Sequence, residues 1–324
     1  MKVRRAARFM RQRGAALLMA MVVVVGVAAA VAGMTWQQSR ALHLEAAARA
    51  QLQAEWILTG ALDWAHAILR EDLRLGGTDH LGEPWAIPIA QVRLATFLSA
   101  GAAVDTVPSE QPDKVLTGRI VDAQSRYNLR NLLGEDGRII PAEMAGLQRL
   151  CDAAGVPADT ASRLADKLRS AWAPSDDERS AGSPIAPTRV PQLVWLGLDA
   201  GLVARLERWV VLLPGRTPVN VNTAAGEVLV AAVDGLDLGS AERLVELRRR
   251  EPFAGIADIQ RHLPEGTSAD ALRIGVASSY FLVHGSLQAD GRVLEQQALV
   301  ERRGAERGRQ VLTLWRERRP FTMP

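Results

Sequence analysis

The chain has 324 residues, a length that predicts two or three compact units and argues against a single small domain. Hydrophobic residues make up 48% of the sequence and charged residues 23%, which excludes a wholly disordered chain. The formal net charge is +3, but six basic residues precede Gly14, and the rest of the chain carries 33 basic and 36 acidic residues, which argues against a general polyanion-binding protein.

The N-terminus combines a basic leader with an apolar segment. The leader, residues 1–14, contains no acidic residue, and residues 15–36 contain no charged residue at all. A helix of this apolar length is about 33 Å long at ~1.5 Å per residue, enough to cross the hydrocarbon core of a membrane. Because the basic residues stand on one side of the segment, the positive-inside rule predicts a cytoplasmic N-terminus.

The helical pattern continues beyond the apolar segment. Apolar residues recur at helical spacing as far as Leu69, and no proline occurs before Pro84. The pattern predicts one helix of about 55 to 60 residues. A cleavable secretory signal peptide is the competing interpretation, because the alanine-rich residues 28–33 could offer a signal-peptidase site. The apolar run is longer than a usual signal-peptide core and has no polar break, which favours a retained helix.

These residues resemble the N-terminus of type IV pilins and pseudopilins, which carry a short basic leader ending in glycine. The resemblance implies that prepilin peptidase cuts between Gly14 and Ala15 and that Ala15 becomes the N-methylated first residue. Met19 then replaces the Glu that major subunits have at mature position five. Since that carboxylate neutralises a neighbouring subunit's N-terminal amine inside an apolar bundle, a chain without it is ill suited to repeated stacking. The same departure is typical of the general secretion pathway protein K (GspK) family.

A second resemblance to this family follows a predicted strand. Residues 76–116 are rich in Gly and Pro and predict a loop region. Residues 115–122 alternate in polarity, which predicts a strand. The strand and the residues after it resemble a GspK signature in which Ile-x-Asp is followed by Arg, an aromatic residue, Asn and Leu. The matching residues are Ile120, Asp122, Arg126, Tyr127, Asn128, Leu129 and Asn131.

The middle of the chain is predicted to be helical. Helical patterns fill residues 141–172 and resume at 190–211. Thr223 and Ser240 are placed to cap two further short helices, 224–233 and 241–250.

Together the two short helices predict a helix-hairpin-helix, a SAM-like arrangement, with its turn at Gly235. The Val-Asn-Val-Asn-Thr-Ala run at 219–224 resembles a second conserved block of the GspK family.

Helix-hairpin-helix modules often bind DNA, so the alternative function is a membrane-anchored DNA-binding protein of the DNA-uptake type. In such modules backbone N–H groups of a glycine-containing turn receive a phosphate. Here Asp234 and Asp237 flank the turn and would repel it. The arginines at 248–250 form either a basic patch or a solvated helix end, and the second interpretation is favoured.

The C-terminal residues predict three antiparallel strands from Ser279 onwards, with turns near 289–291 and 304–308. With the strand at 115–122 they would complete a pilin-like sheet packed on the long helix, which makes residues 126–278 an insertion. The fold class is therefore α+β with a large all-α insertion. The predicted division is a leader at 1–14, a transmembrane helix at 15–36, the pilin-like helix and first strand at 37–125, a helical insertion at 126–212, the helix-hairpin-helix-like region at 213–278 and the final strands at 279–324.

No catalytic residue is predicted. The five histidines lack metal-binding spacing, and neither a Gly-x-Ser-x-Gly motif nor a phosphate-binding glycine loop occurs, which predicts a non-enzyme. Several members of the GspK family bind calcium in an acidic loop. The corresponding loop here keeps Asp176, Asp177 and Glu178, but Ser170 and Ala173 stand where the family has carboxylates. Since calcium takes about six to eight oxygen ligands, a solvated loop and a weak calcium site both remain open.

The resemblance implies a function in type II secretion. A protein of this family is a minor pseudopilin at the pseudopilus tip, where it initiates or caps assembly for export of folded proteins across the outer membrane. It implies an inner-membrane protein with a single span and a periplasmic C-terminal domain. The implied partners are minor pseudopilins of the I, J and H types, the major pseudopilin, prepilin peptidase and inner-membrane lipid, with no nucleic acid.

Overall fold

The computed structural model describes residues 3–93, 114–173, 182–289, 292–304, 308 and 310–322. The chain divides into two compact units, Met1–Ile57 and Leu58–Pro324. The described part of the first unit is helical, whereas the second contains a sheet and a set of shorter helices.

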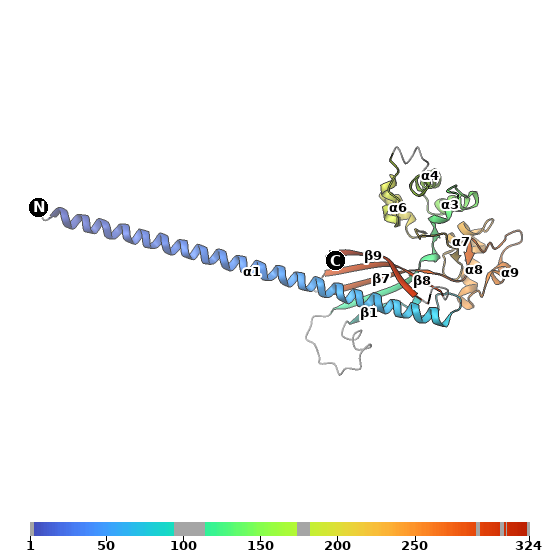
Figure 1. Cartoon of the computed structure of the whole chain (residues 1–324), viewed down its shortest axis with the longest axis horizontal. Helices are drawn as coiled ribbons and strands as arrows, with labels where there is room; N and C mark the ends of the chain where they lie inside the picture. Colours follow the sequence, from blue (N-terminus) through green and yellow to red (C-terminus); the bar gives the residue numbers. More distant parts are fainter. Residues whose placement is uncertain are drawn as a thin grey trace, which may run out of the picture. The chain divides into compact units, whose positions relative to one another are not determined.

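Helix α1 spans Val3–Leu75, so it forms the first unit and continues into the second (Figure 1). Every side chain from Ala15 to Gln53 is exposed. Among the described residues, α1 is the one helix long and apolar enough to cross a membrane. The prediction of one uninterrupted helix is confirmed, but α1 has 73 residues rather than about 55 to 60, because it also includes the leader from Val3 onwards. It ends where Gly76 adopts a left-handed conformation with a φ of 68°.

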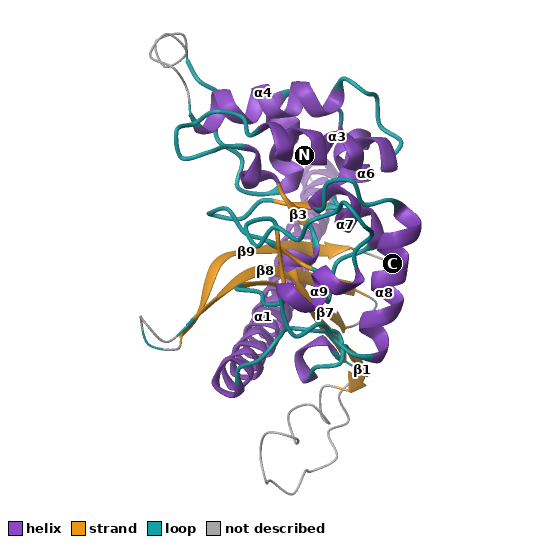
Figure 2. Cartoon of the chain, turned by 90° about the vertical axis from the view of Figure 1, so that its right-hand side faces the viewer, coloured by secondary structure: helices purple, strands orange, loops and turns teal. Residues whose placement is uncertain are grey.

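A five-stranded antiparallel sheet follows in the second unit, with the strand order β1-β2-β7-β8-β9 (Figure 2). The strands are β1 (Ile89–Arg93), β2 (Val115–Asp122), β7 (Tyr280–Ala289), β8 (Arg292–Arg303) and β9 (Gln310–Thr322). The predicted strands at 115–122 and after Ser279 are confirmed. Since β2 pairs directly with β7, the residues between them are an insertion into the sheet, as predicted.

The prediction of a loop region throughout 76–116 is wrong in one part. This stretch contains the short 3-10 helix η1 (Pro84–Ala86) and the edge strand β1. Strand β1 has only five residues and follows Pro88, so the turn-forming composition around it concealed its pattern.

The C-terminal part of α1, from Leu58 onwards, packs on one face of the sheet. Leu62, Ala65 and Leu69 are buried in a cluster with Trp85, whose ring meets that of Phe281 edge to face at 5.2 Å between centroids. The strands contribute the remaining buried members, Ile120, Val283, Ala298, Val300 and Val311. The pilin-like pairing of a long helix with an antiparallel sheet is therefore present.

The inserted residues form a helical region with its own core. All fully buried members of that core lie between Tyr127 and Ile274. The helices are α3 (Pro141–Ala153), α4 (Thr160–Trp172), α6 (Ala200–Leu206), α7 (Gly226–Ala232), α8 (Leu238–Arg250) and α9 (Ile256–His262), with 3-10 helices η2 (Ala123–Ser125), η3 (Leu129–Leu132) and η4 (Val190–Leu196). Four two-residue strands join them in parallel pairs, β3 (Tyr127–Asn128) with β4 (Val210–Val211) and β5 (Val219–Asn220) with β6 (Ile274–Gly275).

Two of the predicted helical stretches are interrupted in the structure, and these interruptions were not predicted. Residues 141–172 contain α3 and α4, separated around Gly155, which has a φ of 62°. Residues 190–211 contain η4, α6 and the strand β4. An apolar period of this kind marks the buried face but does not show where the backbone turns.

Both predicted helix caps are wrong. Helix α7 begins after Ala225, and the Thr223 hydroxyl instead donates a hydrogen bond to Asp122 at 2.6 Å. Helix α8 is capped by Asp237, whose carboxylate accepts from the backbone N–H of Ser240 at 2.9 Å. Ser240 therefore lies inside the first turn, and the hydroxyl of Thr223 forms a tertiary hydrogen bond instead of capping a helix.

Candidate functional site

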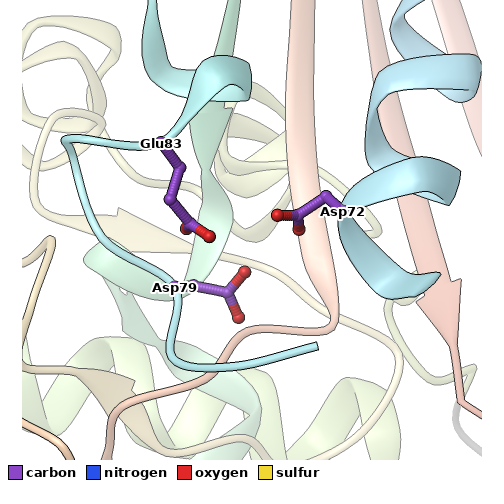
Figure 3. Close-up of side chains that lie close together, drawn as sticks. All are labelled: Asp72, Asp79 and Glu83. Carbon is purple, nitrogen blue, oxygen red and sulfur yellow. The ribbon is translucent and has the colours of Figure 1, made fainter. Parts of the chain in front are cut away.

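Three carboxylates lie close together where α1 ends and the chain turns towards η1. Asp72 comes from the last turn of α1, Asp79 from the following loop and Glu83 from the residue before η1; one oxygen of each lies within 4.8 Å of the others (Figure 3). Glu83 accepts hydrogen bonds from the backbone N–H of His80 and the indole N–H of Trp85, each at 2.8 Å. Three like charges so close repel one another, so the cluster requires a cation or a proton.

Arg302 of β8 supplies a positive charge to this cluster. Its guanidinium forms ion pairs with Asp72 and with both oxygens of Asp79, the latter at 2.6 and 2.7 Å. It also donates to the carbonyl oxygen of Ser278 at 2.8 Å and lies 4.9 Å from the ring centroid of Phe281. The chain's own guanidinium thus binds two of the three carboxylates, and we interpret the cluster as a joint between α1, its loop and the sheet.

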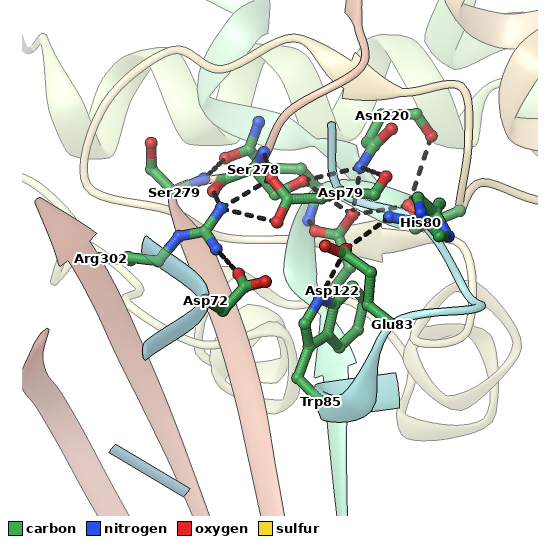
Figure 4. A network of polar contacts seen from close by, with 12 residues as sticks. Asp72, Asp79, His80, Glu83, Trp85, Asp122, Asn220, Ser278, Ser279 and Arg302 are labelled. Atoms are coloured by element: carbon green, nitrogen blue, oxygen red, sulfur yellow. Dashed lines mark hydrogen bonds and ion pairs between the residues drawn. The ribbon is translucent and has the colours of Figure 1, made fainter. Parts of the chain in front are cut away.

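Asp122, the last residue of β2, is the centre of the adjoining polar network (Figure 4). Its carboxylate accepts hydrogen bonds from the hydroxyls of Thr223 at 2.6 Å and Ser278 at 2.7 Å, from the Asn220 amide at 2.9 Å and from the backbone N–H of Gln124 at 2.7 Å. The side chain is 1% exposed. One carboxylate therefore connects the end of the sheet with two segments, one before α7 and one after α9.

The asparagines of the 219–224 block are buried bridges. In addition to its bond to the central carboxylate, Asn220 donates to the carbonyl oxygen of Asp79 at 3.1 Å. Asn222 exchanges two hydrogen bonds with the backbone of Phe253, at 2.9 and 3.0 Å. These contacts give the block a structural role, because both amides donate to distant parts of the chain and Asn222 also accepts from one.

The asparagines after β2 act in the same way. Asn128 donates to the carbonyl oxygen of Gly215 at 2.8 Å and accepts from the N–H of Leu213 at 3.2 Å. Asn131 exchanges bonds of 2.8 and 3.0 Å with the backbone of Thr217. Both motifs that resemble the GspK family thus hold loops of the helical region in place.

Burial controls the titration of these carboxyls. It raises the pKa of Asp122 to about 6, and the hydrogen bonds to its carboxylate only partly oppose this. Burial also raises the pKa of Asp72 to about 6, where Arg302 opposes the shift and Glu83 adds to it. The pKa of Asp79 is raised by burial as well, against the influence of Arg302.

These shifts predict a protein that is more stable at pH 5 than at pH 7. The ordinary pKa of an aspartate is 3.8, so between about pH 4 and pH 6 the unfolded chain loses protons that the folded chain keeps. The stabilisation is complete below the lower value and is lost as the pH rises through about 6. We expect the free energy of unfolding to fall by about 1 kcal/mol from each of Asp72 and Asp122 between pH 5 and pH 7.

Chemical unfolding of the full chain in detergent at both pH values measures this difference. Asp122→Asn is the matched variant, because it removes one titrating group and leaves the histidines unchanged. It should flatten the pH dependence whatever it does to the absolute stability. An equal slope in the variant would contradict the assignment.

A second buried ionic network lies inside the helical region. The Tyr127 hydroxyl donates to Glu143 at 2.7 Å, and Arg273 forms ion pairs with Glu143 at 3.2 Å and with Asp234 at 2.9 Å. Arg149 contacts the same oxygen of Asp234 at 2.6 Å. Burial raises the pKa of Asp234, but the two arginines outweigh it and hold the pKa below its usual range. The carboxylate of Asp234, between α7 and α8, therefore pairs with arginines of α3 and of the segment after α9.

One of the three arginines at the end of α8 is buried, whereas Arg249 and Arg250 are exposed. Arg248 is 9% exposed and donates to the carbonyl oxygens of Val221 and Ala224, so it belongs neither to a basic patch nor to a solvated helix end. For Arg248, therefore, both interpretations of the arginines at 248–250, a basic patch and a solvated helix end, are wrong. With Asp237 capping α8 beside the turn, phosphate would meet carboxylates there.

The predicted processing residues lie in α1, within the first unit. Ala15 and Met19 are exposed, as is every side chain between them. The structure brings no partner to them, so the processing site remains a prediction. The calcium candidates lie outside the described residues: Asp176, Asp177 and Glu178.

Asp79 and Arg302 were not predicted from the sequence. Asp79 follows a glycine-rich turn, where an acidic residue is ordinary. Arg302 stands in a Glu-Arg-Arg run that looks solvated, yet the period of two in β8 places it on the same face as the buried Ala298 and Val300. That alternation was the available signal.

Comparisons with known proteins agree with one another. The family described as "Type II secretion system (T2SS), protein K" matches residues 125–215 and 219–277 in two parts. Type II secretion system protein K of Pseudomonas aeruginosa is 30% identical over 296 residues, covering 84% of this chain and 83% of that protein. Its counterpart in Klebsiella pneumoniae is 27% identical, covering 91% and 94%. A chain in the crystal structure of the GspK-GspI-GspJ complex of enterotoxigenic Escherichia coli matches with a TM-score of 0.62 at 20% identity, covering 84% of this chain and 97% of that one.

Proposed function

The chain belongs to the type II secretion system protein K family and is a minor pseudopilin, and on that premise we propose that it occupies the tip of the pseudopilus, where it initiates or caps assembly. The observation that carries this proposal is the helical region inserted between β2 and β7. A subunit with so large an insertion would obstruct another subunit stacking beyond it. The absence of a carboxylate at Met19 supports the same place, because such a subunit lacks a group used in repeated stacking.

The buried polar contacts around Asp122 and Arg302 support the proposal, because they fix the helical region to the sheet. Asp122 and Arg302 tie the sheet to residues on both sides of the hairpin, and the asparagine bridges hold the loops between them. A fully satisfied buried network favours one arrangement over others, because each alternative leaves polar groups unpaired. The insertion would then act as a rigid stop rather than as a loosely attached domain.

We further propose that residues 15–36 form a single inner-membrane span, with the leader in the cytoplasm and the second unit in the periplasm. The solved relative is part of a complex of GspK with GspI and GspJ. By analogy, the proposed partners here are minor pseudopilins of the I, J and H types, the major pseudopilin, prepilin peptidase and membrane lipid. The predicted absence of enzymatic activity is part of the same proposal.

Two finer assignments remain predictions. We propose that α7 and α8 form a helix-hairpin-helix used for packing, since the acidic residues at its turn are engaged within the chain. That use leaves the DNA-uptake alternative without a supporting contact in the described residues. Weak calcium binding at residues 176–178 is the other assignment.

Labelling tests the tip position. In cells that overproduce the major pseudopilin, gold-labelled antibody against a tag on this chain should bind at one end of each pseudopilus. Raising the amount of this chain should shorten the pseudopili, because each copy begins or ends one filament while the supply of major subunit is fixed. Electron microscopy measures both. Label along the whole shaft, or lengths that do not respond, would contradict the proposal.

A further inference from the structure

The sheet face opposite α1 is apolar in one row of paired residues and polar in the next two rows. The row at Val121 runs through Leu282 and Leu299 to Trp315, and these apolar side chains pack beneath Val211 and Leu213 of the helical region. The next two rows on the same face are polar. They are Arg119, His284, Gln297 and Glu317, and then Thr117, Ser286 and Glu295.

These polar rows form the floor of a trough of about 690 Å³. Ala204 of α6, followed by Glu207 and Arg208, forms a wall over the floor, and Pro88 and Ile89 lie at the β1 edge. The floor extends from β2 to β9, three interstrand steps or about 14 Å. An extended peptide of about four residues covers that distance.

Three arginines line the trough: Arg119 on β2, Arg126 just after η2 and Arg208 just after α6. Within the part of the chain that the structure describes, none of the three forms an ion pair with a carboxylate. Arg208 stacks on Trp209, 4.8 Å from the ring centroid, and Arg119 is exposed.

Arg126 is the most informative of the three. It is half-buried, and its guanidinium makes no hydrogen bond to any described residue. Burial lowers its pKa; Glu207 opposes this shift from beyond ion-pair distance, and Arg119 adds to it. A guanidinium that is partly removed from water without a counter-ion carries a cost that a bound anion would remove.

The charge of the trough is polarised along its length. Its arginines lie towards β2, with Glu207 close enough to raise the pKa of Arg126, whereas Glu295 and Glu317 lie at β8 and β9, where Glu317 is already paired with Arg189 at 2.6 Å. Thr117, Ser286 and Gln297 lie along the floor and offer hydrogen-bonding groups suited to peptide amides. This arrangement suits a peptide with carboxylates at one end and uncharged residues at the other.

We propose that this trough binds an extended acidic peptide segment of a partner protein, with its carboxylates held by Arg119, Arg126 and Arg208. The inference goes beyond the position at the pseudopilus tip and does not depend on it, because peptide binding is measured on the isolated chain. Charge-assisted hydrogen bonds to the guanidinium groups would supply most of the affinity.

Fluorescence anisotropy on the full chain in detergent tests the inference. The probe is a short fluorescein-labelled peptide in which a Glu-Glu pair is followed by Ser and Thr residues, and the control peptide has Gln-Gln instead. We expect salt-sensitive binding of the first peptide only. Arg126→Met should weaken it by at least about tenfold, and the exposed Arg119→Gln by about two- to fivefold.

Two matched variants and one stability measurement complete the test. Arg250→Gln, at an exposed arginine outside the trough, and Glu295→Gln, at the far end of the floor, should not weaken binding. Arg126→Met should not lower the unfolding temperature, because no ion pair is lost. Equal binding of the two peptides, or unchanged binding in both Arg126→Met and Arg119→Gln, would overturn the inference. If Arg126→Met fails to fold, the Arg119→Gln result decides.

Discussion

Replacing Arg302 with Met is expected to lower the free energy of unfolding by about 3–5 kcal/mol. The guanidinium is the ion-pair partner of both Asp72 and Asp79, and it also donates a hydrogen bond to the carbonyl oxygen of Ser278. Removing it leaves two carboxylates buried beside each other without a counter-ion. Both already have a raised pKa, so protonation will recover part of the loss. Urea unfolding of the full chain, followed by tryptophan fluorescence, measures the change.

The neighbouring residue provides the control. Arg303 lies on the opposite side of β8 and pairs with Glu301 at 2.8 Å, in a partly exposed position. Because exposed pairs are worth little, Arg303→Met should cost less than about 1 kcal/mol. Adding Asp79→Asn to Arg302→Met should recover part of the lost stability by removing one of the unpaired charges. Equal costs for the two arginine variants would show that Arg302 has no special role.

The sequence predicted those elements whose pattern is long. Helix α1 and strands β2, β7, β8 and β9 each repeat their period often enough to be recognised, and the pairing of β2 with β7 followed from treating the helices as an insertion. The five-residue strand β1 was not predicted, because a few residues beside prolines carry too little pattern. Gly155 divides a helical pattern that reads as continuous, since apolar spacing alone does not reveal a turn.

The polar joint was harder to predict than the elements it connects. Asp122 and Asn220 were noticed only through a family resemblance, and nothing in the sequence predicted that they contact each other at 2.9 Å. Thr223 illustrates the physical reason. Its position before a helix predicted a cap, but a buried carboxylate from β2 offers its hydroxyl a stronger partner. Contacts between distant segments override local preference, and a single sequence does not record them.

Gly14→Leu is expected to abolish processing and, with it, secretion. If the chain is cut as its resemblance to pseudopilins implies, the peptidase acts on the peptide bond between Gly14 and Ala15, and a branched side chain at that residue would block access to the carbonyl carbon. Intact mass spectrometry after co-expression with prepilin peptidase should show the loss of residues 1–14 from the native chain. The variant should keep its full mass.

The secretion defect has a physical reason of its own. An uncut leader keeps six basic residues on the cytoplasmic side of the apolar segment. To leave the membrane and enter a pseudopilus, the helix would have to draw them through hydrocarbon, at about 2.5–3.5 kcal/mol for each charge on the insertion scale. Gly33→Leu is the matched control, because it changes a glycine of the same helix beyond the cut and should leave processing intact. A native chain that stays uncut, or is cut near Gly33, would show that α1 is an ordinary anchor or a signal peptide, and the proposed place in the pseudopilus would then be wrong.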